Sequence, residues 1–117
     1  MKRIVINRSY DEFCISHKAL IRLRELGQRE ALAEEDSGAY WPAAARPREP
    51  SLNQYGQLIP RDDADLVRVV EELGEAADGH AATLRIVTIP EDVKWVITKT
   101  EGGEQVSEVH RTWGGAK

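Results

Sequence analysis

The sequence predicts a small α/β or α+β domain, with a mixed sheet of about four strands and two main helices in the order strand, helix, loop, helix, strand, hairpin. Three observations lead to this prediction. Apolar residues recur at helical spacing between positions 66 and 77. The run 84–89 (LRIVTI) is typical of a buried strand and is closed by Pro90. Gly102-Gly103 separates two further strand-like runs, which is a typical hairpin signal.

The first half of the chain opens with a strand and a helix. Residues 2–7 are rich in β-branched side chains, which favour a strand. Ser16 can cap a helix that Gly27 can end, with an apolar stripe formed by Ala19, Leu20, Leu23 and Leu26. Residues 29–35 are rich in helix formers and predict a further helical turn or two.

Residues 36–57 form a predicted long surface loop, because Pro47 and Pro50 cannot lie inside a helix or a central strand. Tyr40 and Trp41 are unusual in such a segment. Two interpretations are open: both rings anchor the loop on the body of the protein, or the loop is a recognition lid that binds a partner. We expect one domain over residues 1–113 and a tail over 114–117.

The second half continues with a helix, a strand and a hairpin. Asp62 and Asp63 can cap the helix, and Gly79 can end it. A first strand followed by helices and a second buried strand favours a parallel pair joined by a right-handed crossover. In the hairpin, a two-residue loop at Gly102-Gly103 places the residue pairs that follow opposite one another: Trp95 with His110, Ile97 with Glu108, and Glu101 with Glu104, which would repel.

Composition limits the class of protein. The net charge of −4 gives no support to general nucleic-acid binding. Cys14 is the only cysteine, so an intrachain disulfide and a cysteine metal cluster are excluded, and a cytoplasmic location is expected. The short apolar run at positions 4–6 predicts neither a signal peptide nor a membrane helix. No metal-ligand spacing or phosphate-loop motif occurs, so we expect no metal and no cofactor.

The predicted parallel pair brings polar residues to one end of the sheet. The carboxyl ends of parallel strands and the starts of the helices would lie together there, which is where ligands and anions bind in open α/β sheets. The candidate ligand-binding residues are Arg8, Tyr10, Arg61, Asp62, His110 and Arg111. The alternative is that the aspartates only cap the helix and that the arginines make ordinary surface ion pairs.

Catalytic candidates are few. Glu108 and His110 lie two apart on one predicted strand and share a face, so the carboxylate could orient the imidazole. The alternative is an exposed polar face, because no nucleophile is identifiable beside them. Cys14 with His17 resembles a nucleophile pair, but burial of Cys14 is favoured by its apolar neighbours. Trp113 is a candidate either for the core or for a partner interface.

Several blocks in fixed order resemble a family of small uncharacterised proteins of tailed phages and prophages. These blocks are MKRIVINR at 1–8, IPRDD at 59–63 with 66–67 and 70–74, IP at 89–90 with 92–93 and Trp95, and HRTW at 110–113. The resemblance implies a phage context and no established activity. Residues 10–13 (YDEF) depart from the family's Tyr-Gly-Gly-Phe turn, which removes the close backbone approach that glycines allow.

The leading hypothesis is therefore a small accessory protein that binds, without catalysis, a host protein or a small anionic ligand such as a nucleotide. Two alternatives remain. One is a small nucleotide-processing enzyme that uses the same crevice, with His110 and Glu108 or Asp62 as acid–base groups. The other is a structural interaction module that acts through Trp113 and the Tyr40-Trp41 loop. The sequence indicates neither the ligand nor the oligomeric state.

Overall fold

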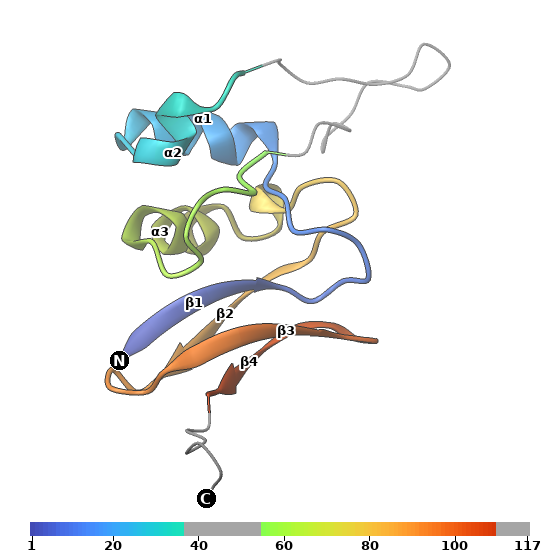
Figure 1. Ribbon diagram of the computed structural model, residues 1–117. Helices are drawn as coiled ribbons and strands as arrows, with labels where there is room; N and C mark the ends of the chain where they lie inside the picture. Colours follow the sequence, from blue (N-terminus) through green and yellow to red (C-terminus); the bar gives the residue numbers. More distant parts are fainter. Residues whose placement is uncertain (37–54, 110–117) are drawn as a thin grey trace, which may run out of the picture.

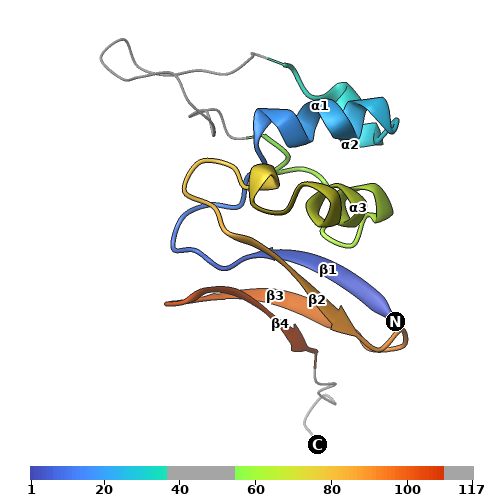
Figure 2. The same ribbon diagram turned by 180° about the vertical axis from the view of Figure 1, so that it is seen from behind.

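A computed structural model describes residues 1–36 and 55–109 of the chain. Helices and strands stack in layers, with α1 and α2 outermost, then α3, then β1 with β2, and finally the β3–β4 hairpin (Figures 1 and 2). This confirms the mixed α and β fold class and the predicted order of elements. The bounds are β1 Lys2–Asn7, α1 His17–Glu25, α2 Arg29–Ala33, α3 Ala64–Leu73, the 3₁₀ helix η1 Gly74–Ala77, β2 Leu84–Ile89, β3 Trp95–Thr100 and β4 Gly103–Glu108.

The first helix forms for the reasons that the sequence predicts. The Ser16 side chain accepts a hydrogen bond from the Ala19 amide at 3.1 Å, which satisfies one of the free N–H groups of the first turn. Gly27, with φ of +83°, ends α1 in the left-handed region that glycine tolerates. The predicted further turns are present as α2, capped by Gln28.

The second main helix is shorter than predicted. Asp63 caps it by accepting the Leu66 amide at 3.0 Å, as expected. The helix ends at Leu73 rather than at Gly79, because Gly74 takes a φ of +56°, which breaks the helical hydrogen-bond pattern. Gly79 has another role: a Cβ there would lie 2.5 Å from the Cys14 Sγ, so glycine allows two segments to approach closely.

The predicted parallel pairing of the first and second strands is wrong. β1 and β2 are antiparallel, and Asn7 at the end of β1 lies opposite Leu84 at the start of β2. The direction of α3 explains this. Asp62, just before α3, lies 3.9 Å from Lys2 at the start of β1, whereas the carbonyl of Ala77, just after it, accepts the Ser16 amide. The chain therefore leaves the helices at the carboxyl end of β1, and β2 can only run back.

β1 is buried on both faces. Ile4, Val5 and Ile6 follow one another and none is more than 2% exposed. Side chains alternate between the faces of a strand. Val5 belongs to the core beneath the helices, so Ile4 and Ile6 point to the opposite face, which the hairpin covers. The hairpin thus completes the core of the domain instead of extending the sheet, and the four strands form two antiparallel pairs.

The hairpin is present, but its register differs from the prediction. Trp95 lies opposite Glu108, and Ile97 opposite Val106, so each partner is two residues earlier than expected. The turn consists of Glu101 and Gly102, and Glu104 faces Lys99 instead of Glu101. A shift by an even number of residues keeps every side chain on its predicted face.

Candidate functional site

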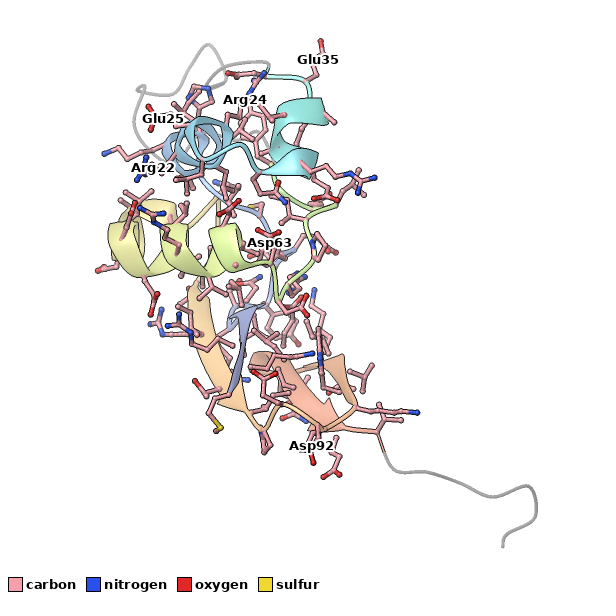
Figure 3. The ribbon with its side chains drawn as sticks, turned by 90° about the vertical axis from the view of Figure 1, so that its left-hand side faces the viewer. Arg22, Arg24, Glu25, Glu35, Asp63 and Asp92 are labelled. Carbon is pink, nitrogen blue, oxygen red and sulfur yellow. The ribbon has the colours of Figure 1, made fainter. Side chains whose placement is uncertain are left out.

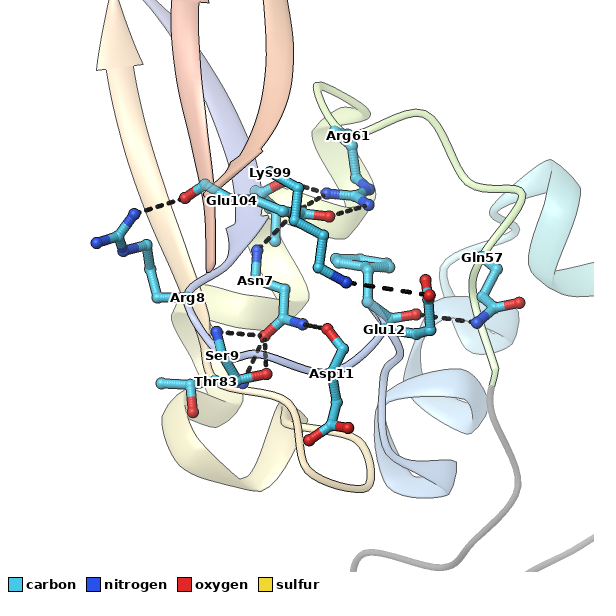
Figure 4. A network of polar contacts seen from close by, with 12 residues as sticks. Asn7, Arg8, Ser9, Asp11, Glu12, Gln57, Arg61, Thr83, Lys99 and Glu104 are labelled. Carbon is cyan, nitrogen blue, oxygen red and sulfur yellow. Dashed lines mark hydrogen bonds and ion pairs between the residues drawn. The ribbon is translucent and has the colours of Figure 1, made fainter. Parts of the chain in front are cut away.

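The end of β1 is organised by Asn7, a fully buried amide (Figure 4). Its Oδ1 accepts hydrogen bonds from the Ser9 amide and hydroxyl and from the Thr83 amide at 2.8 Å, and its Nδ2 donates to the Asp11 carbonyl at 2.7 Å. One side chain thereby fixes the loop after β1 and the entry to β2. A buried amide whose donor and acceptor are both used is a structural element rather than a free binding group.

Arg61 and Glu104 close the outer edge of β1. Two bonds join them, Nη1 to Oε1 at 2.6 Å and Nη2 to Oε2 at 3.0 Å. Glu104 also accepts the Asn7 amide at 2.8 Å, and the Arg61 carbonyl accepts the Val5 amide. Burial works to raise the pKa of Glu104, but the hydrogen bonds from Arg61 and Asn7 outweigh it and hold that pKa below its ordinary value.

Arg61 was predicted to bind a ligand, and its guanidinium is engaged inside the protein. Besides Glu104, it lies 3.7 Å from the centre of the Phe13 ring and donates to the Val5 carbonyl at 3.3 Å. Only 19% of its side chain is exposed. These contacts hold the segment before α3, β1 and the hairpin together, so Arg61 contributes to the fold and has little capacity left for a ligand.

The other predicted ligand-binding residues do not converge. Tyr10 is 73% exposed in the loop after β1. Asp62 lies at the opposite end of β1, beside Lys2. Glu108 ends β4 in a pocket of about 370 Å³ with Asp92, Val93, Lys94 and Val109, and Figure 3 shows Asp92 at the far end of the molecule from α1. The expected convergence required parallel strands, and it fails with them. His110, Arg111, Tyr40, Trp41 and Trp113 lie outside the described residues.

A groove of about 390 Å³ lies between the β1–β2 sheet and β4. Arg8 and Arg85 border it, Gln105 adds an amide, and its apolar part is formed by Ile6, Val87 and Val106. We call this the Arg8–Arg85 groove. Arg8 Nη1 donates to the Glu104 carbonyl and Arg85 Nη1 to the Leu84 carbonyl, each at 2.7 Å. These backbone contacts orient both guanidinium groups without neutralising their charge.

Neither arginine forms an ion pair with any residue in the described ranges, 1–36 and 55–109. Some arginines of the helices do form ion pairs. Arg22 pairs with Glu72 at 2.9 Å and with Glu25 at 3.2 Å, and Figure 3 shows side chains of both signs on α1. The lining of the Arg8–Arg85 groove contains two arginines and no acidic side chain, so it carries an excess of positive charge, which the nearby Asp78 reduces in part. Two guanidinium forks beside an apolar floor can bind a carboxylate or a phosphate.

Sequence reasoning found Arg8 but missed Arg85. The signal was available, because Arg85 is the only charged residue in the run 84–89 and shares a face with Val87 and Ile89. We interpreted this run as buried on both faces, so the exposed face that carries Arg85 was not considered. In the structure, Leu84 and Ile86 pack on the core beneath the helices, and Arg85 is exposed on the opposite face.

Cys14 is buried, as the sequence favoured. Burial raises the pKa of its thiol to about 11, and its Sγ lies 3.4 Å from the His80 carbonyl. His17 does not activate it. The His17 ring instead contacts Asp36 at 2.9 Å and packs on Tyr55 with the ring centres 5.7 Å apart. The described residues hold no group of three or more histidine, cysteine or acidic side chains suited to a metal ion.

Within the described ranges, none of the helices has the length and apolar character needed to cross a membrane. Comparisons with protein-family models, curated proteins and solved structures find no match to this chain. The resemblance to small phage and prophage proteins therefore stays a prediction from the sequence.

Proposed function

We propose that this chain is a non-enzymatic binding protein that takes an anionic group of its ligand in the Arg8–Arg85 groove. The observation that carries the proposal is the pair of exposed guanidinium groups that border one groove and form no ion pair among the described residues, although the Asp78 carboxylate interacts with Arg85 at longer range. Arginine presents a planar fork of N–H donors that matches a carboxylate or a phosphate. The apolar floor can hold the uncharged part of the same ligand.

The lining of the groove favours binding over turnover. Its side chains are two arginines, a glutamine and three aliphatic residues, so the lining contains no histidine, carboxylate, lysine or cysteine to act as a general acid or base. The Glu108 carboxylate, a predicted acid–base candidate, lies three residues beyond Gln105 on β4 and lines a different pocket. A general acid or base must reach the reacting atom directly or through one water. A phage or prophage accessory role is the biological context that we propose for this binding.

A thermal-shift screen with free phosphate, nucleotides and dicarboxylates tests the proposal. A compound at 100 times its Kd stabilises the folded protein by about 2.7 kcal/mol, which is a readily measured shift. We expect Arg8→Gln and Arg85→Gln each to weaken binding about tenfold, because each removes a charge-assisted contact. Arg68→Gln is the matched control, since Arg68 is an exposed α3 arginine outside the groove.

The outcomes separate the binding protein from the nucleotide-processing enzyme. Stabilisation that is lost in both groove variants and kept in Arg68→Gln supports the proposal. Stabilisation that survives in both groove variants places the ligand elsewhere and contradicts it. Mass spectrometry of the mixtures checks for products. Conversion of a bound nucleotide would contradict a purely binding function and support the hypothesis of a nucleotide-processing enzyme.

A further inference from the structure

The two edges of the β1–β2 sheet differ in whether their backbone N–H and C=O groups are already hydrogen-bonded. At the outer edge of β1, the Val5 amide donates to the Arg61 carbonyl, and the Asn7 amide donates to the Glu104 carboxylate. The Val5 carbonyl accepts from Arg61 Nη1. This edge is closed to another strand, as is common at exposed sheet edges.

The outer edge of β2 is open beyond its first residue. N–H and C=O groups of successive residues in a strand point to opposite edges. Because Val5 and Asn7 direct theirs away from β2, their neighbours Ile4 and Ile6 bond to Val87 and Arg85. Leu84, Ile86 and Thr88 therefore direct their backbone groups outward. The Leu84 amide donates to Asp78 at 3.0 Å, whereas Ile86 and Thr88 have no strand beyond them within the described part of the chain.

The charge of Arg85 lies at this open edge. Arg85 Nη1 donates to the Leu84 carbonyl, which points outward from β2, so the guanidinium bends toward the outer side of the strand. The side chains of Arg85 and Val87 share the face that lines the Arg8–Arg85 groove. The edge thus offers free backbone groups next to one positive and one apolar position, two residues apart.

We propose that the partner of the groove is an extended peptide segment that adds as a strand to the outer edge of β2. This inference rests on the proposed function and names its partner class. Backbone hydrogen bonds to Ile86 and Thr88 provide affinity, and side chains on alternate positions provide selectivity. Charge complementarity defines the peptide: an acidic residue beside Arg85 and an apolar residue beside Val87, with one residue between them.

A second copy of this chain fits the edge less well. In a symmetric antiparallel pairing centred on Val87, Ile89 of one copy lies opposite Arg85 of the other, so no carboxylate meets the guanidinium. A pairing centred on Thr88 would bring Glu91 there, but it places Pro90, which has no N–H, opposite the outward-facing Ile86. An acidic peptide from another protein can both form backbone hydrogen bonds with the edge of β2 and place a carboxylate beside Arg85.

The first experiment selects short random peptides displayed on particles for binding to the wild-type protein, with counter-selection against Arg85→Gln. We expect enriched peptides to carry an acidic residue two positions from an apolar one. Fluorescence titration of an enriched peptide then compares Thr88→Pro with Thr88→Ala. Proline removes the outward N–H without touching the bonds to β1, so we expect at least a tenfold loss of affinity, against less than twofold for alanine.

Peptide N-methylation provides a readout that does not depend on the folding of a variant. Methylating the peptide amides one at a time removes single donors, and only every second residue of an added strand faces β2. We expect loss of binding at alternate positions and tolerance at the positions between them. Uniform tolerance, or equal affinities of Thr88→Pro and Thr88→Ala, would overturn strand addition. A dimer in size-exclusion chromatography that Thr88→Pro abolishes would also overturn it in favour of self-pairing.

The outcomes distinguish this inference from the proposed function. If phosphate or a nucleotide stabilises the protein in an Arg85-dependent manner and no peptide is enriched, strand addition is wrong and the anion-binding function stands. If neither the small anions nor the peptides bind, both proposals fail.

Discussion

Arg61 and Glu104, 43 residues apart in the sequence, form a two-point ion pair that docks the hairpin onto the rest of the domain. Their side chains are only 19% and 12% exposed, and Glu104 also holds the amide of Asn7. The pair therefore connects three segments: the approach to α3, the end of β1 and the start of β4. Because it is mostly buried, removing one partner leaves the other charge poorly solvated.

Arg61→Ala should destabilise the protein by about 2–3 kcal/mol, because the Glu104 carboxylate loses both guanidinium bonds while remaining buried. Urea unfolding followed by circular dichroism measures the change. The double variant Arg61→Ala/Glu104→Ala should cost less than the sum of the single changes, since it leaves no buried charge. Arg68→Ala is the control: its pairing with Glu72 is exposed, so we expect a cost below about 0.5 kcal/mol. Additive single changes at positions 61 and 104 would contradict the coupling.

The lowered pKa of Glu104 predicts a contribution to stability that depends on pH. A carboxyl with a lower pKa in the folded state stabilises the protein above its unfolded pKa of about 4.3, and the contribution is lost as the pH falls through the folded value. Glu104→Gln removes this contribution. We therefore expect its free energy of unfolding to rise less steeply with pH than that of the wild type in the acid range below about pH 5. An unchanged slope would contradict the assignment.

Asp78 should act in the opposite direction. Burial raises its pKa, although the hydrogen bond from the Leu84 amide and the nearby Arg85 oppose the rise. A raised folded pKa contributes stability below the unfolded value of about 3.9, and this is lost as the pH rises through the folded value. Asp78→Asn should therefore steepen the acid limb that Glu104→Gln flattens. The two nearly isosteric variants serve as controls for each other in the same pH series of urea titrations.

Cys14 should be unreactive in the folded protein. Its side chain is fully buried and the pKa of its thiol is about 11, so at pH 8 only about one thiol in a thousand is ionised. We expect iodoacetamide to modify Cys14 only as fast as the protein opens, and to modify it readily in guanidinium chloride. Rapid stoichiometric labelling of the native protein, measured by intact mass, would contradict this environment.

Local signals in the sequence predicted the elements well, and long-range pairing was predicted poorly. β1 and β2 lie at the expected residues, because β-branched runs and Pro90 are local features. The pairing direction depends on where α3 begins relative to β1, which is fixed by contacts such as Asp62 with Lys2. No local pattern encodes such a contact. The parallel assumption therefore placed Asp62 and Glu108 at the wrong end of the sheet.

The candidate site shows the same division. Arg8 was found because it directly follows a predicted strand. Arg85 was missed because its neighbours made the strand look buried on both faces. Glu104 was placed beside the turn and opposite Glu101, and its role depends on Arg61, which reaches it only in the folded protein. Side chains that meet through tertiary contacts cannot be paired from one sequence alone.

Gly103 explains why the hairpin register differs from the prediction, and it leads to the last test. Gly103 has a φ of +108° and packs so tightly that a Cβ would lie 2.6 Å from the Arg8 backbone. A residue in this position cannot be a solvent-exposed turn tip, so the turn moves to Glu101 and Gly102 and Gly103 becomes the first residue of β4. At Gly102, a Cβ would meet only the end of the flexible Arg8 side chain, at 3.3 Å.

Gly103→Ala should therefore cost at least about 2 kcal/mol, through both backbone strain and collision with the Arg8 backbone. Gly102→Ala is the matched control one residue away, and its cost should stay below about 1 kcal/mol because Arg8 can move. Urea unfolding measures both. Hydrogen exchange should also show earlier opening of β3 and β4 in Gly103→Ala, since the hairpin tip no longer seats on Arg8. Equal effects of the two substitutions would mean that the hairpin tip does not pack on the end of β1 in this way. The Arg8–Arg85 groove would then lack the side that β4 forms.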